Sequence, residues 1–288
     1  MRNLVYSAII SLSAMACTQT QKSNTRKDIN NHSTSRFFSK YVKDSFSIFV
    51  SLPADYSPEN KKIYPVVYIL DANLYFDIVS VIAKKYSEVG LLSSVILVGI
   101  GYQSFLAMDS LRSRDYTYPI AIPEYEMSLS GGADKFLSFI KDELMADIDN
   151  KYQVDKTRRI LMGHSLGGYF VLYALQQNLS RTDSSFFGYV AASPSIHYNH
   201  SYLLHQFQNL SAHNNRSKVY VTFGGIEDTE NAQDTAMPSS NKVFQTLSLS
   251  LKQKDSITFL GEPFSNLGHM GTQLPTFVKG LQWILDAQ

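Results

Sequence analysis

The sequence predicts an α/β fold of three layers, in which helices cover both faces of a mostly parallel sheet. Apolar strand-like runs alternate with longer amphipathic runs along the chain. The middle strand-like runs, VVYIL and VILVGI, are apolar at consecutive positions, as in strands that helices cover on both sides. The length of 288 residues suits a single α/β unit of this kind.

The elements follow from these patterns in chain order. The expected strands are short β-rich runs at 46–52, 66–70, 95–100, 159–162, 188–192, 219–223 and 257–260. The expected helices are amphipathic runs at 75–89, 133–150, 166–177, 202–212, 241–252 and 272–286. The stretch from Tyr102 to Gly132 is rich in polar and turn residues. We expect it to be a long loop that crosses the C-terminal edge of the sheet, where such folds bind ligands.

Composition and charge exclude several classes of partner. The formal net charge is +1, so the chain has no overall basic field that would hold a nucleic acid or an anionic membrane. Hydrophobic residues make up 44% of the chain and charged residues 18%, which is the balance of a packed globular protein. The single cysteine, Cys17, excludes an intrachain disulfide and a cysteine-ligated metal cluster. We therefore expect a small-molecule substrate and no nucleic-acid partner.

The N-terminal segment is typical of an export signal. Arg2 precedes an apolar run, Leu4 to Ala16, which is too short to span a bilayer comfortably and ends in the small-x-small pattern AMA. Cys17 follows directly, where bacterial lipoproteins carry the cysteine that is lipidated after cleavage, although Ala14 replaces their usual leucine. We expect an exported bacterial protein, either a lipoprotein anchored to the membrane only through Cys17 or a periplasmic protein released by plain signal cleavage.

The segment after the cysteine is polar. The residues TQTQKSNTRKDINNHSTSR, at 18–36, include almost no apolar side chains and cannot bury enough surface to fold alone. The chain is therefore expected to divide into a signal peptide at 1–16, a polar tether at 17–45 and a folded domain at 46–288.

The segment GHSLGG, at 163–168, follows an apolar strand and precedes a helical run. This is the G-x-S-x-G pattern in its strand-turn-helix context, and it predicts a nucleophile at Ser165 in an α/β-hydrolase fold. Gly163 and Gly167 remove the side chains that would collide on so sharp a turn. The helix that begins behind the serine directs N–H groups and its positive dipole end toward developing negative charge.

A serine needs a general base at neutral pH, and histidine is the usual one. In this fold the chain order is serine, acid, histidine. His269 lies in a loop between the last expected strand and the last expected helix, which is the position of the base. His164, next to the nucleophile, is expected to be structural and to point away from the reacting centre. The other downstream histidines crowd around the expected helix at 202–212 and are interpreted as surface residues.

The acid of such a site should follow the strand at 219–223, where it would orient the imidazole and stabilise the imidazolium. The next residues, GGIEDTEN, offer Glu227, Asp228 and Glu230. We predict that Glu227 is the acid, and Asp228 is the alternative.

Several segments together resemble a known family. They are YPVVYILDANLYF at 64–76, RSRDYT at 112–117, GHSLGG at 163–168, ASPSI at 192–196, and then FGGIE and LGH. In this order they are similar to the Putative esterase family, which includes enterobactin-type siderophore esterases, feruloyl esterases, esterase D and mycolyltransferases. The resemblance covers the chain from about Phe46 to the C-terminus.

The resemblance implies an oxyanion hole formed by the backbone N–H groups of Leu166 and Asn73. Two positions depart from the family pattern. Ala72 replaces the usual glycine of the Leu-Asp-Gly turn, which bears on the geometry of that turn. His197 and Tyr198 stand where an aromatic residue, often tryptophan, commonly follows the Ser-Pro-Ser segment, which bears on substrate preference.

The predicted reaction is hydrolysis of a carboxylic ester through an acyl-enzyme on Ser165. It requires no metal and no organic cofactor. A siderophore-type ester is one expected substrate. Acyl transfer to an alcohol on the same fold, and a catalytically inactive binding lipoprotein, are the alternatives.

Two arginines in the expected loop are candidates for substrate binding. Arg112 and Arg114 each carry a guanidinium that can hold a carboxylate or phenolate oxygen in two directions. The alternative is that one of them pairs with Asp115 or another acid of the loop and only braces the loop.

Overall fold

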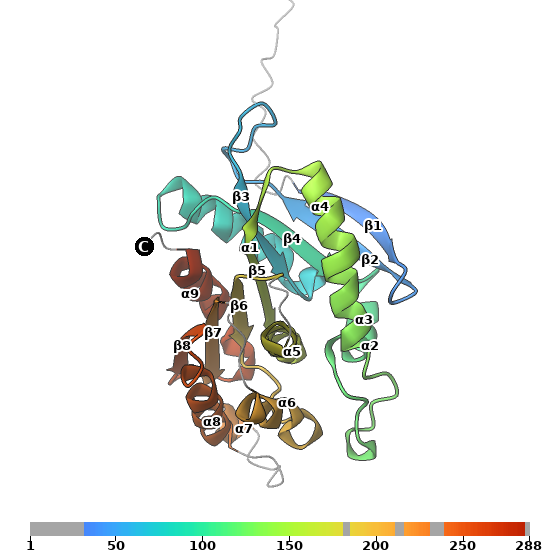
Figure 1. Cartoon of the computed structure of the whole chain (residues 1–288), viewed down its shortest axis with the longest axis vertical. Helices are drawn as coiled ribbons and strands as arrows, with labels where there is room; N and C mark the ends of the chain where they lie inside the picture. The colour runs from blue at the N-terminus through green and yellow to red at the C-terminus, as the bar shows by residue number, and fades with distance from the viewer. Residues whose placement is uncertain (1–31, 181–184, 211–215, 231–238, 286–288) are drawn as a thin grey trace, which may run out of the picture.

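The computed structural model describes residues 32–180, 185–210, 216–230 and 239–285. Its middle layer is an 8-stranded sheet with the strand order β1-β2-β4-β3-β5-β6-β7-β8 (Figure 1). β1 pairs antiparallel with β2, and β2 pairs antiparallel with β4, whereas all the other neighbours pair in parallel. The predicted α/β class with a mostly parallel sheet is confirmed.

The elements have the following bounds. The strands are β1 Ser33–Ser39, β2 Asp44–Ser51, β3 Tyr64–Ile69, β4 Ile96–Gly101, β5 Val154–His164, β6 Gly188–Ala192, β7 Ser217–Gly224 and β8 Ile257–Phe264. The α-helices are α1 Ala72–Glu88, α2 Phe105–Tyr116, α3 Ala133–Ser138, α4 Met145–Lys151, α5 Leu166–Ser180, α6 Tyr198–Asn209, α7 Glu227–Glu230, α8 Ser240–Lys252 and α9 Gln273–Leu285. The short helical segments are η1 Pro123–Tyr125, η2 Phe139–Leu144, which is a π-helical segment between α3 and α4, and η3 His269–Gly271. All the strands and helices expected from the sequence are present.

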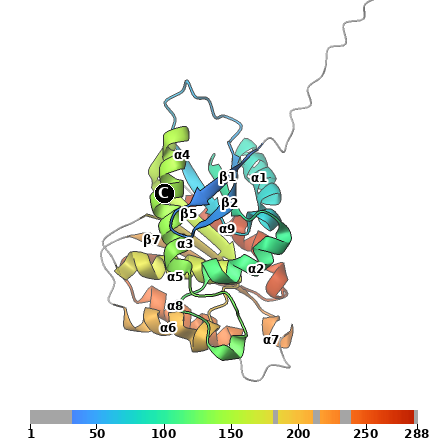
Figure 2. The same ribbon diagram turned by 90° about the vertical axis from the view of Figure 1, so that its right-hand side faces the viewer.

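The sheet buries both of its faces. Successive residues of β3 alternate between them, because side chains in a strand point to opposite sides. Val67 and Ile69 pack with apolar residues of α1 and α9, whereas Val66 and Tyr68 belong to the larger core under α3, α4, α5, α6 and α8. Figures 1 and 2 show α1 and α9 on one side of the sheet and α4 and α5 on the other.

The order of the strands reverses at β3. From β3 the chain first adds β4 on one side and later adds β5 on the other, so the connections that leave β3 and β5 diverge. In open α/β sheets, a crevice for ligands forms at such a reversal, outside the carboxyl ends of the strands. In this chain β3 leads to Asp71 and α1, and β5 leads to Ser165 and α5.

The expected boundary between tether and domain is wrong. Residues 33–45 are not part of a tether, because β1 pairs with β2 along its whole length at the edge of the sheet. The hydroxyl of Ser39 also donates to Glu143 over 2.8 Å. Most side chains of β1 are exposed, and backbone hydrogen bonds hold the strand, so its composition did not reveal it. The expected signal peptide, Cys17 and the tether up to residue 31 lie outside the described residues.

The expected long loop at 102–132 is also wrong in part, since it contains α2 and η1. Ser104 caps α2, and its side chain accepts a hydrogen bond from the N–H of Ala107. The first two residues of α2, Phe105 and Leu106, are exposed, so its apolar residues do not follow a helical stripe.

Among the described residues, no helix has the length and apolar character needed to cross a membrane.

Candidate active site

Ser165 lies on a sharp turn between β5 and α5 at the carboxyl edge of the sheet. Its φ is 59°, a left-handed conformation that is rare for a residue with a side chain. A Cβ added at Gly163 would lie only 2.7 Å from the backbone of Gly167, so glycine is needed there for the chain to turn back on itself. The N–H of Ser165 donates to the carbonyl of Ala192 over 3.0 Å, and its carbonyl accepts from the N–H of Ser195 over 3.1 Å.

His269 and Glu227 meet at the same edge of the sheet. His269 begins η3, which follows β8 after a short turn, and Glu227 begins α7, just after β7. The two side chains are in contact, with 3.3 Å between His269 Nδ1 and Glu227 Oε2. A carboxylate can only accept in this contact, so Nδ1 of the histidine carries a proton, and in the neutral ring Nε2 is the nitrogen with the lone pair. This is the arrangement that a general base requires.

Glu227 is almost fully buried, with 4% of the residue exposed. Burial by itself would raise the pKa of this carboxyl, but hydrogen bonds from His269, Ser193 and the backbone N–H of Gly224 outweigh burial and lower the pKa below its ordinary value. The group is therefore an ionised acceptor when it faces His269. Asp228 has other partners, since it accepts from the hydroxyl of Ser239 and the N–H of Ser240, each over 2.6 Å.

The turn after β3 is held in a left-handed conformation by Asp71, with φ 51°. Ala72 is then the first residue of α1, so glycine is not required at this position for the turn to form. The side chain of Asn73 bridges to the end of β4, since it accepts from the N–H of Tyr102 over 2.7 Å and donates to the Tyr102 carbonyl over 3.0 Å. Asn73 and Leu166 both lie in the first turn of a helix, where N–H groups have no carbonyl partner within the helix.

The structure pairs both candidate arginines with carboxylates. Arg112 makes a two-pronged contact with the buried Asp71, with 3.0 Å from Nε to Oδ1 and 2.8 Å from Nη2 to Oδ2. Arg114 pairs in the same way with the buried Asp115, over 2.8 and 3.0 Å, and also reaches Asp44 over 2.9 Å. Both residues lie on α2 rather than on a loop. The contact of Arg114 with Asp115 matches the bracing alternative, whereas Arg112 braces the turn after β3, which lies outside the expected loop.

His164 is buried and has partners at both ring nitrogens. Its Nε2 lies 2.9 Å from the carbonyl oxygen of His269, and its Nδ1 lies 3.0 Å from the hydroxyl of Tyr75. With both nitrogens engaged, His164 has none left to accept the proton of Ser165. This supports the expectation that it is not the base.

Three residues of the site were not assigned from the sequence. Ser193 donates to Glu227, Thr272 lies 2.7 Å from the Ser193 hydroxyl, and the Ser195 hydroxyl lies 3.3 Å from that of Ser165. The signal was present for two of them, because Ser193 and Ser195 directly follow β6, whose carboxyl end lies beside that of β5. Within the described residues, no group of three or more His, Cys, Asp and Glu side chains is arranged to hold a metal ion.

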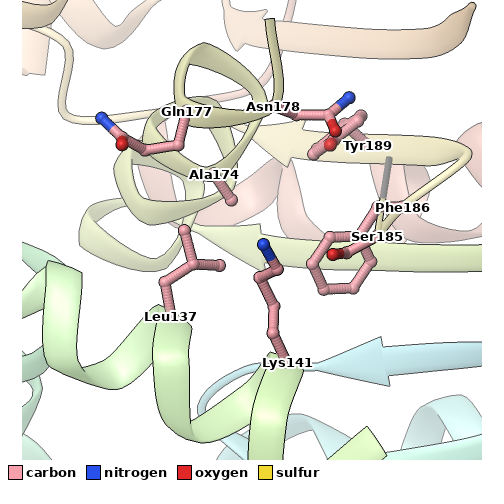
Figure 3. A pocket seen from close by; sticks show the side chains of 8 residues that line it. All are labelled: Leu137, Lys141, Ala174, Gln177, Asn178, Ser185, Phe186 and Tyr189. Carbon is pink, nitrogen blue, oxygen red and sulfur yellow. The ribbon is translucent and has the colours of Figure 1, made fainter. Parts of the chain in front are cut away.

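A small cavity of about 20 Å³ lies apart from this site (Figure 3). It is lined by side chains of α3, η2, the last turns of α5 and the start of β6: Leu137, Lys141, Ala174, Gln177, Asn178, Ser185, Phe186 and Tyr189. Ser165 precedes the first turn of α5, so the cavity and the serine lie at opposite ends of that helix.

Comparison with known proteins identifies the family. A sequence model described as "Putative esterase" matches residues 39–258. The chain belongs to this esterase family. It is 34% identical over 250 residues to the ferri-bacillibactin esterase BesA of Bacillus subtilis strain 168, and the match covers 82% of each chain. It is 28% identical over 235 residues to the apo-salmochelin esterase of Escherichia coli O6:H1, which covers 78% of this chain and 70% of that one.

A solved structure agrees with this assignment. The BES protein from Bacillus cereus superposes with a TM-score of 0.73 and 25% sequence identity, over 98% of this chain and 100% of that chain. The family resemblance, the fold class and the esterase activity expected from the sequence are thus confirmed.

Replacing Arg112 distinguishes bracing from substrate binding. Arg112→Ala leaves the charge of the buried Asp71 without its partner, so we expect the free energy of unfolding to fall by about 3–5 kcal/mol. We expect kcat/KM to fall equally for an anionic ester and a matched neutral ester, because the arginine acts on the turn before Asn73 and not on the substrate. Thermal melting and steady-state kinetics below the melting temperature measure the two effects.

Arg114→Ala is the matched control for this variant. It removes the partner of another buried carboxylate, Asp115, on the same helix, so it should lower stability with less effect on kcat/KM. A loss in Arg112→Ala confined to the anionic ester would instead show that this arginine binds substrate.

Proposed function

We propose that this esterase hydrolyses its substrate through a triad of Ser165, His269 and Glu227. The contact between His269 Nδ1 and the ionised Glu227 carries the proposal, because it presents the basic nitrogen of the imidazole at the sheet edge from which Ser165 emerges. The left-handed turn at Ser165 supports the same assignment, since strained turns of this kind are typical of a serine nucleophile.

The reaction follows in two steps. Ser165 Oγ attacks the ester carbonyl carbon while His269 takes the hydroxyl proton, and the oxyanion accepts hydrogen bonds from the N–H groups of Leu166 and Asn73. The bond to the leaving oxygen breaks as His269 returns the proton to it, which releases the alcohol. Water then attacks the acyl-enzyme and gives a proton to His269, and the acid leaves as that proton returns to Ser165. Glu227 holds the imidazole tautomer and stabilises the imidazolium in both steps.

We also propose that the substrate is a siderophore-type ester. The support comes from the relatives, which are named as esterases of ferri-bacillibactin and of apo-salmochelin and which align with most of this chain. A hydrolysis panel that includes such esters beside simple acyl esters tests this. A preference of at least tenfold in kcat/KM for the siderophore-type esters is the expected result.

Replacing the nucleophile or the base should abolish most of the activity. We expect Ser165→Ala and His269→Ala each to lower kcat by at least about 10³-fold while the protein stays folded. Because triad residues act as a unit, the double variant should be little worse than either single variant. Steady-state ester hydrolysis measures this, with circular dichroism to confirm the fold. His205→Ala, which changes an exposed histidine on α6, serves as the control. Turnover near that of the native protein in folded Ser165→Ala would refute the triad.

The two neighbouring acids should behave differently. Glu227→Gln removes the charge that holds the proton on His269 Nδ1, so we expect kcat to fall by about 10²–10⁴-fold. Asp228→Asn alters contacts to Ser239 and Ser240 at the start of α8, so it should lower stability slightly and leave kcat within about twofold of native. Kinetics and melting curves of the two variants measure this, and the reverse order of damage would transfer the role to Asp228.

The chain is further proposed to be exported and anchored through a lipid on Cys17, on the grounds given by its first residues. Cys17→Ser should then move the protein from the membrane fraction to the soluble fraction without changing its specific activity. Fractionation with activity assays measures both quantities, and retention of the variant in the membrane fraction would exclude the lipid as the main attachment.

A further inference from the structure

The protons of the buried pair Tyr75 and His164 can be assigned from their partners. The carbonyl oxygen of His269 can only accept a hydrogen bond, so the His164 Nε2 that lies 2.9 Å away must carry a proton. In a neutral imidazole the other nitrogen, Nδ1, is then an acceptor, so the Tyr75 hydroxyl at 3.0 Å is the donor. The hydrogen bonds therefore run in one direction, from Tyr75 on α1 through His164 to the backbone of His269.

The charge state of the pair agrees with this assignment. Burial lowers the pKa of His164 to about 4, and the charges of His269 and Arg112 act in the same direction, while the hydrogen bond to the His269 backbone and the charge of Glu227 oppose them. Burial also raises the pKa of Tyr75 above its ordinary value, so its hydroxyl stays a neutral donor. The two side chains therefore remain uncharged across the ordinary working range of pH.

The carbonyl of His269 lies within hydrogen-bond distance of two side chains, one of which is His164. The other group within reach is the hydroxyl of Thr272, at 3.1 Å. That hydroxyl lies closer to Ser193, at 2.7 Å, and the proton of Ser193 is already directed to Glu227. Whichever oxygen takes the Thr272 proton, the carbonyl oxygen of His269 has two lone pairs and keeps one for His164.

The position of His164 matters because of what His269 does in the proposed reaction. The two imidazole rings are tilted against each other with centroids 4.7 Å apart. His269 gains a proton in each chemical step, and a second cation at this distance would oppose that gain. Because His164 is neutral, it can hold the backbone of His269, and so keep the His269 ring against Glu227, without opposing the protonation of that ring.

We infer that Tyr75 and His164 are positioning residues for the catalytic base, His269. The hydroxyl of Tyr75 donates to neutral His164, and Nε2 of His164 donates to the carbonyl of His269, so the two side chains hold the backbone of the base in place. The inference rests on the proposed function of His269. It gives a chemical task to the histidine that precedes the nucleophile and to a tyrosine on α1, neither of which touches the reacting atoms.

The test compares variants that keep or remove the donor. His164→Gln places an amide N–H near the position of Nε2, whereas His164→Leu fills the volume without a donor. We expect His164→Leu to lower kcat by about 10²-fold with KM changed less than threefold, and His164→Gln to recover at least tenfold of that loss. Equal kcat values for the two folded variants would overturn the inference.

Tyr75→Phe tests the other end of the chain and preserves the packing of the ring against Phe277. Loss of the hydroxyl donor stabilises neutral His164 less, so the pKa of His164 should rise and the acid limb of the kcat profile should begin at higher pH and become steeper. Tyr86→Phe, a tyrosine near the other end of α1, is the matched control and should leave the profile unchanged. An unshifted acid limb in Tyr75→Phe would contradict the inference.

Nuclear magnetic resonance of protein labelled with ¹⁵N-histidine reads the tautomer directly and needs no substrate. In the native protein we expect His164 to be neutral with its proton on Nε2 from pH 5 to pH 9, since its pKa is lowered to about 4. A His164 protonated at pH 7, or with its proton on Nδ1, would overturn the inference. Failure of the proposed triad is distinguished by Ser165→Ala, because a folded Ser165→Ala protein that remains active removes the role of His269, whatever tautomer His164 adopts.

Discussion

The left-handed conformation of Ser165 is the constraint on which the rest of the site depends. Such a backbone costs a residue with a side chain about 1–2 kcal/mol and persists only where the surroundings determine it. Here the N–H of Ser165 is bound by the end of β6, and its carbonyl is bound by the N–H groups of Ser195 and Tyr169. The turn that carries the candidate nucleophile is thus held by the segment at the end of β6 and by the first turn of α5.

The same strain recurs at the ends of the neighbouring strands. Asp71 after β3, Ser165 after β5 and Ser193 after β6 all have positive φ, at 51°, 59° and 38°. These three strands are adjacent and parallel, so their carboxyl ends share one edge of the sheet. Three parts of the site therefore lie along this edge. They are the turn before Asn73, the candidate nucleophile Ser165, and Ser193, which donates to Glu227. Three of the eight non-glycine residues that have a positive φ in the described part of the chain thus lie where the chemistry is proposed.

Polar groups buried at this edge are matched to specific partners. Arg112 holds Asp71, Ser193 and Gly224 hold Glu227, and His164 holds the backbone of His269. Buried charges of this kind add little net stability, because desolvation offsets most of their attraction. Their effect is to leave one arrangement of the edge satisfied and the others with unpaired groups. This selects the geometry in which His269 and Glu227 meet.

The sequence alone determined the layers of the fold, most of the strands of the sheet and of the helices that cover it, and the candidates Ser165, His269 and Glu227. Local patterns specify these, since apolar periodicity and glycine spacing act over a few residues. It did not reveal β1, which backbone pairing holds, or α2, whose exposed Phe105 and Leu106 break the helical stripe.

Only the tertiary structure decided which partners the polar side chains take. Arg112 meets Asp71 across 41 residues of chain, and His164 meets the carbonyl of His269 across 105. The contacts of Glu227 and Asp228 are of the same kind, because two adjacent carboxylates look equivalent until β7 and α7 turn one toward His269 and leave the other at the start of α8. Hydrogen bonds between distant segments depend on how strands are ordered in space, and no local pattern carries that information.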